Sequence, residues 1–187
     1  MLQSRTVVFR SAIGVLHLLL LSAFVTTAPV LAAADDFNHA HGVPAKLVQK
    51  VRENTAQFIN VNNAGPNYAP LFGCVTGPDH GAMGIHYVNL GLVGDGQIDV
   101  RYPEALIYEP MGNKRRLVGV EYIVDAATWL TAHDNVPPQL EGQAFQFVPS
   151  PNRFGLDSFF ELHVWAWRNN PNGAFVDWNN NVTCEGR

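Results

Sequence analysis

The stretch that most constrains the fold is residues 159–167, F-F-E-L-H-V-W-A-W, a long aromatic and β-branched run. Its composition favours a central β-strand. Because strand side chains alternate between two faces, one face carries an apolar set: Phe160, Leu162, Val164 and Ala166. The opposite face carries Phe159, Glu161, His163, Trp165 and Trp167. That face, with a carboxylate and an imidazole between large rings, is either a binding pocket or a second, partly polar packing surface.

The first 34 residues have the pattern of a secretory signal peptide. Arg5 and Arg10 precede an apolar run over residues 12–25, and Ala32–Ala34 offers the small residues that a signal peptidase reads. The alternative is an uncleaved membrane anchor, but the run is shorter than the ~20 residues that a spanning helix needs. We therefore expect a signal peptide over residues 1–34 and a single globular domain over residues 35–187, secreted or periplasmic.

The charge of the expected mature chain limits its partners. Residues 1–34 contain two of the 12 basic residues and none of the 16 acidic ones, which leaves a net charge of −6. A negative chain without a basic patch argues against nucleic acid or anionic lipid as a partner. No later stretch is long and apolar enough to span a bilayer. A small molecule or a metal ion is the expected partner.

The chain has two cysteines, Cys74 and Cys184. In an exported protein a small, even number of cysteines favours a disulfide, here between the C-terminal tail and a loop before the first expected strand. The alternative is two free, unreactive thiols.

The order of predicted elements indicates an α+β fold. We expect a mainly antiparallel, curled β-sheet, with one N-terminal helix over residues 44–60 packed on it and a short inserted helix over residues 126–132. The expected strands are residues 83–90, 104–109, 116–124, 141–148 and 159–167, with a brief return at 174–178. Residues 61–81, rich in Asn, Gly and Pro, are expected to be irregular. A small barrel is the alternative.

Two resemblances to known families rest on short motifs. The block E-L-H-V-W-A-W-R at residues 161–168 resembles a family of exported bacterial hypothetical proteins. More remotely, the His-Tyr, Leu-Ile-Tyr and Leu-Val-Gly-Val-Glu-Tyr pieces within residues 85–124 resemble the oil-body-associated proteins, although the Trp-His-x-His segment of that family has no counterpart here. Neither resemblance implies a known reaction; the resemblance over residues 85–124 implies a shared hairpin core.

One group of polar residues is a candidate metal site. If the strands pair into one sheet, side chains from separate strands converge on one face, and we expect a ligand set of His86, His163, Glu121 and Glu161, with His80 nearby in sequence. Imidazoles with a carboxylate suit a divalent transition metal: zinc, copper, iron or manganese. Tyr108, Trp165 and Trp167 are the expected ligand-binding aromatics. The alternatives are a buried polar network and a metal-free ligand pocket.

The motifs do not decide between three functions. The chain has no His-Glu-x-x-His, no glycine-rich phosphate loop before a helix and no Gly-x-Ser-x-Gly elbow. The first hypothesis is a non-catalytic protein that binds a metal ion or small ligand. The second is a metal-dependent enzyme that uses the same histidines and glutamates. The third is an interaction or structural domain of the cell envelope.

Overall fold

The computed structural model describes residues 35–77 and 79–186, and the predicted signal peptide lies outside this range. Side chains are described from residue 45 onward. The elements in chain order are α1 (Asp35–Thr55), η1 (Ala56–Ile59), η2 (Val61–Asn67), β1 (Ala69–Gly77), β2 (Gly81–Val88), α2 (Leu90–Val93), β3 (Ala105–Met111), β4 (Lys114–Asp125), α3 (Ala126–Ala132), β5 (Gln139–Leu140), β6 (Gln143–Ala144), β7 (Gln146–Val148) and β8 (Phe159–Val164). Among these residues, no helix combines the length and the apolar character that crossing a membrane requires.

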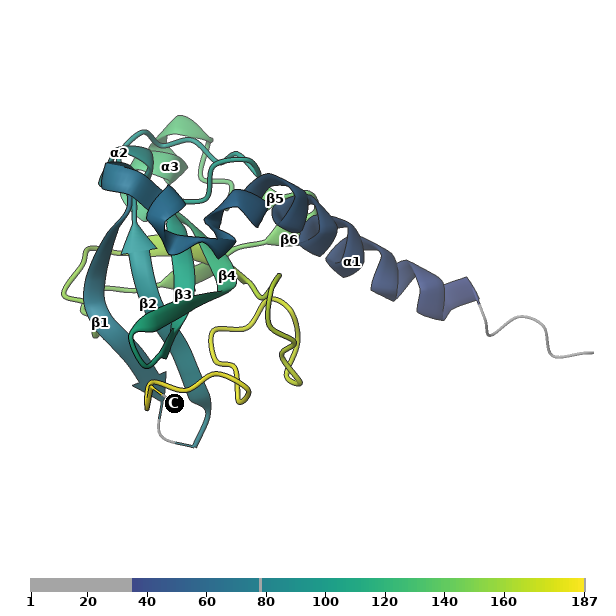
Figure 1. Cartoon of the computed structure of the whole chain (residues 1–187). Coiled ribbons are helices and arrows are strands. Elements are labelled where there is room, and N and C mark those ends of the chain that lie inside the picture. Colours follow the sequence, from purple (N-terminus) through teal and green to yellow (C-terminus); the bar gives the residue numbers. More distant parts are fainter. Residues whose placement is uncertain (1–34, 78, 187) are drawn as a thin grey trace, which may run out of the picture. The chain divides into compact units, whose positions relative to one another are not determined.

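The fold is a six-stranded antiparallel sheet in the order β1-β2-β3-β4-β8-β7 that curls into a half-barrel. Figure 1 shows β1 to β4 side by side. Register shifts interrupt the β1–β2 and β3–β4 ladders, and such bulges bend strands and increase their twist. The predicted α+β class, with a curled sheet, an N-terminal helix and a short inserted helix, is confirmed.

Helix α1 packs on one face of the sheet and defines the main core. Leu47 and Val51 of the helix are fully buried in this core. They lie with the α1-facing residues of the strands: Leu106, Tyr108, Val120, Tyr122, Phe160, Leu162 and Val164. The helix is further held by Arg52, whose Nε donates to the carbonyl of Ala166. The prediction that Phe160, Leu162, Val164 and Ala166 form plain core is confirmed.

The sheet has one strand more at its N-terminal edge than the sequence predicted. Residues 61–81 were expected to be irregular, but they contain β1, with Pro70 and Gly73 inside it. Proline has no backbone N–H to donate to a neighbouring strand. It is tolerated in β1 because β1 is an edge strand, where an N–H that points away from the sheet has no partner strand. Two other expectations were wrong in detail: residues 141–148 form the short strands β6 and β7, and residues 174–178, within the described chain, form no strand.

The disulfide is confirmed. Cys74 in β1 is bonded to Cys184, which lies 110 positions further along the sequence. It ties the C-terminal tail to the edge of the sheet. A second tie is the isolated bridge between Ala82 and Asn179.

Removing this disulfide should destabilise the domain. We expect the double substitution Cys74→Ser and Cys184→Ser to lower the free energy of unfolding by up to about 5 kcal/mol, because the unfolded chain regains the freedom of a loop of 110 residues. Urea denaturation followed by tryptophan fluorescence measures this. Wild type reduced with a phosphine should shift by the same amount. Equal midpoints for oxidised wild type and the double variant would contradict it.

Candidate metal centre

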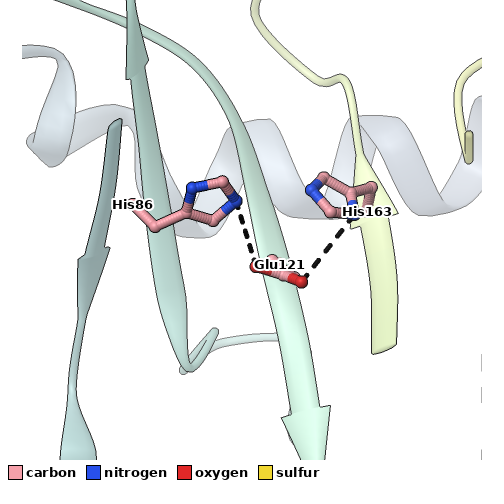
Figure 2. Close-up of side chains that lie close together, drawn as sticks. All are labelled: His86, Glu121 and His163. Atoms are coloured by element: carbon pink, nitrogen blue, oxygen red, sulfur yellow. Dashed lines mark ion pairs between the residues drawn. The ribbon is translucent and has the colours of Figure 1, made fainter. Parts of the chain in front are cut away.

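Strand register brings three polar side chains together on the face of the sheet opposite α1. Glu121 of β4 pairs directly with His163 of β8. His86 of β2 lies one strand further away, across β3, where Ala105 is the register partner of Glu121. The residue of β3 opposite His86 is Ile107, two residues from Ala105, so His86 and Glu121 lie diagonally across β3. Figure 2 shows the three side chains in front of the strands, converging on one point, with α1 behind the sheet.

The distances within this group suit a metal ion. His86 Nε2 is 3.3 Å from Glu121 Oε2, and His163 Nδ1 is 3.8 Å from Glu121 Oε1. The two imidazoles meet edge to face, with ring centroids 5.7 Å apart. One ligand atom from each residue lies within 4.8 Å of the others. Tetrahedral ligands on bonds of about 2.1 Å stand about 3.4 Å apart, so small side-chain movements would complete the coordination.

Of the three residues, His163 has the most buried polar atoms without a hydrogen-bond partner in the part of the chain that the structure describes. It is 1% exposed. Within residues 35–77 and 79–186, neither of its ring nitrogens has a hydrogen-bond partner, and the same holds for Nδ1 of His86. Buried polar atoms are nearly always paired, because an unpaired one loses the hydrogen bonds that water would give it. The group therefore has donor atoms that need a partner.

Burial also sets the protonation of the group. Loss of water lowers the pKa of His86 to about 3, with help from the neighbouring His163, and burial alone lowers the pKa of His163 to about 3. Burial, followed by the charge of Glu161, raises the pKa of Glu121 well above its usual value. In the metal-free protein, burial therefore favours the neutral form of both imidazoles and of the Glu121 carboxyl. Neutral imidazoles carry the free electron pair that a metal requires.

A second, overlapping group extends the site. Glu161, His163 and Asp177 also place ligand atoms within 4.8 Å of one another. Asp177 Oδ1 lies 3.8 Å from His163 Nδ1 and accepts a hydrogen bond from Gln146 Nε2 at 2.7 Å. Burial raises the pKa of Asp177 and raises that of Glu161 to about 7. Sequence reasoning missed Asp177, because it lies in a loop whose position only the tertiary structure determines.

The predicted site residues divide between two faces of the sheet. His86, Glu121, Glu161 and His163 lie together, as expected. Trp165 also lies on this side: its ring stacks on His163 at 6.1 Å between centroids, and its Nε1 donates to the carbonyl of Val176.

The other three predicted residues lie elsewhere. Tyr108 is in the core under α1, and its hydroxyl donates to the carbonyl of Phe58. Trp167 faces α1 as well and donates to Thr55 Oγ1. The placement of Trp167 with the histidines was wrong because β8 ends at Val164, so the alternation of faces does not continue. His80 is exposed between β1 and β2 and belongs to neither group of potential ligands.

Comparison with models of known protein families, with curated proteins and with solved structures finds no significant match for this chain. The resemblances based on short motifs therefore stay predictions. What can be said of function rests on the site itself.

Replacing Glu161 should change how the stability of the metal-free protein depends on pH. Because its pKa rises from 4.5 to about 7 on folding, the stabilising contribution of the protonated carboxyl is complete below about pH 4.5 and is lost as the pH rises through about 7. Wild type should therefore lose more unfolding free energy between about pH 5 and pH 8 than Glu161→Gln, whose amide does not titrate.

Urea denaturation in the presence of a chelator, repeated across this pH range, tests this. Asp157→Asn is the matched control, because Asp157 is exposed and outside both ligand groups. Parallel curves for wild type and Glu161→Gln would contradict the expectation.

Proposed function

We propose that this protein binds one divalent transition-metal ion through His86, Glu121 and His163. The observation that carries the proposal is His163: a buried imidazole with no partner for either ring nitrogen in the described chain, facing Glu121 directly across the strand pair. The third ligand, His86, approaches the same carboxylate from the other side. Figure 2 shows a ring nitrogen of His163 turned toward the His86 ring.

The donor set favours zinc or iron among the transition metals. Two imidazoles and one carboxylate form the protein ligands of catalytic zinc sites and of non-haem iron(II) sites, both of which keep a position open. Both cysteines are in the disulfide, so no thiolate is present to favour copper(I). Asp177 and Glu161 next to His163 supply carboxylates that orient a ligating histidine.

A metal-dependent enzyme is the second candidate function. It is favoured by a cavity of about 40 Å³ whose walls include His86, Glu121 and Glu161, so that one side of the group faces open space. At this side a metal-bound water or small substrate has room to bind. A purely structural polar network is the remaining alternative, and it gives no reason for unpaired nitrogens on His163.

An extracytoplasmic location accords with this proposal. A disulfide persists in oxidising compartments and is rare in the cytosol. The signal-like pattern over residues 1–34 points the same way. We propose a secreted or periplasmic protein.

Metal binding is tested by titrating chelator-treated protein with Zn²⁺ and measuring bound zinc by mass spectrometry. We expect one zinc ion per chain. Substitution His163→Gln should weaken binding by more than about 100-fold, since losing even a group that only orients a ligand weakens metal binding 10–100-fold. His80→Ala, at an exposed histidine outside the group, should leave the stoichiometry and affinity unchanged.

Circular dichroism checks that the variants fold, and His86→Gln replaces His163→Gln if the latter does not. Wild-type protein that binds no zinc, iron or cobalt would refute the proposal. So would zinc binding that both histidine variants retain.

A further inference from the structure

The cavity beside the candidate metal centre has one polar end and a long apolar wall. His86, Glu121 and Glu161 form the polar end. The other six lining residues are apolar: Phe72, Val88, Ile123, Phe154, Leu156 and Phe159. With a volume of about 40 Å³, the cavity holds one water molecule or the tip of a larger molecule, and not a whole drug-sized ligand.

The outer end of the cavity is a set of apolar side chains that reach the surface. Phe72 is 52% exposed and Leu156 is 44% exposed. Phe154 lies between the surface and the inner wall, with its ring 5.4 Å from Phe72 and 6.4 Å from Phe159. These rings form a continuous apolar path from solvent to the polar end. Exposed large apolar groups that continue into a cavity are typical of ligand sites.

Phe72 is held in this position by an unusual backbone conformation. Its φ is +60°, in the left-handed region that bulky residues rarely adopt. It lies in a bulge of β1, between the paired residues Leu71 and Cys74. Strained residues of this kind persist where the surrounding structure fixes them, and they are concentrated at ligand-contacting positions. The neighbouring Cys74, bonded to Cys184, anchors one side of the bulge.

We propose that this cavity admits an uncharged, largely apolar small molecule that binds the metal through a nitrogen or oxygen donor at its tip. The inference rests on the proposed metal site. The cavity volume limits the part that enters to the donor and the atoms next to it, while Phe72, Phe154 and Leu156 contact the apolar remainder.

The charges around the cavity select the uncharged class. When the metal is bound, the carboxylates of Glu121, Glu161 and the nearby Asp177 offset its positive charge, so the site has little net attraction for an anionic donor. The apolar wall disfavours a charged body of either sign, because the wall offers no hydrogen bonds to replace those with water. An apolar molecule has no hydrogen bonds with water to lose when it enters the cavity.

The experiment uses the full chain loaded with Co²⁺, whose visible absorption bands report on its ligands. Three probes are titrated at pH 8: imidazole, which has the donor alone; 4-phenylimidazole, which adds an apolar body; and benzoate, which has the body with an anionic donor. We expect 4-phenylimidazole to bind about tenfold more tightly than imidazole, from the apolar area of the phenyl ring that leaves water. Benzoate should leave the spectrum unchanged at the same concentrations.

Phe72→Ala should raise the Kd for 4-phenylimidazole by about fivefold and so remove most of the preference for it over imidazole. The cobalt stoichiometry and the Kd for imidazole should stay unchanged. Phe147→Ala is the matched control: Phe147 is similarly exposed, at 53%, but packs on Phe160 and does not line the cavity. If Phe72→Ala does not fold, Leu156→Ala takes its place.

The outcomes separate the two proposals. Failure to bind cobalt would overturn the metal site and this inference with it. Bound cobalt with no spectral change for any probe, with equal affinity for imidazole and 4-phenylimidazole, or with tighter binding of benzoate, would overturn this inference alone. Equal effects of Phe72→Ala and Phe147→Ala would also overturn it.

Discussion

The site depends on one register: Glu121 of β4 opposite His163 of β8. Side chains alternate along a strand, so a shift of one residue in this pairing would turn one of the two side chains to the α1 face. Glu121 and His163 would then lie on opposite faces of the sheet and could not bind the same ion. The register is strongly specified by the other face, where Val120, Tyr122 and Leu162 are buried under α1. Ordinary hydrophobic packing on one side of the sheet thus fixes the polar group on the other.

The two faces of the sheet have different tasks. The α1 face carries the larger core, which includes the hydroxyl-bonded Tyr108 and Tyr122. The opposite face has a smaller apolar cluster around Ile107, Val118 and Trp165, and next to it the buried histidines and glutamates. Burying these polar groups stabilises nothing by itself and is unfavourable unless they are paired. The larger core is what allows the fold to tolerate them.

For the site, the sequence allowed prediction of the residues that lie on the sheet, and of few others. Alternation along residues 159–167 placed Glu161 and His163 on one face, and this was correct because β8 is regular there. The same rule failed at Trp167, since nothing in an aromatic run marks the residue at which pairing stops. Asp177 and Phe72 were missed for a different reason: one lies in a loop and the other in a bulge of an edge strand, and their positions depend on contacts distant in sequence. The predicted disulfide joined the correct segments without revealing what they cover.

The disulfide explains how segments outside the sheet centre come to surround the site. Phe72 lies two residues before Cys74, and Asp177 lies seven residues before Cys184, so the two half-cystines follow the two segments that add a cavity wall and a third carboxylate. Between Asp177 and Cys184, the bridge from Asn179 to Ala82 and the bond from the Thr183 amide to Glu109 hold the tail along β2 and β3. A loop that is fixed at both ends has few conformations to lose on binding a ligand. The rigid sheet therefore supplies the metal ligands, and the tethered segments supply the walls that decide which molecule can approach them.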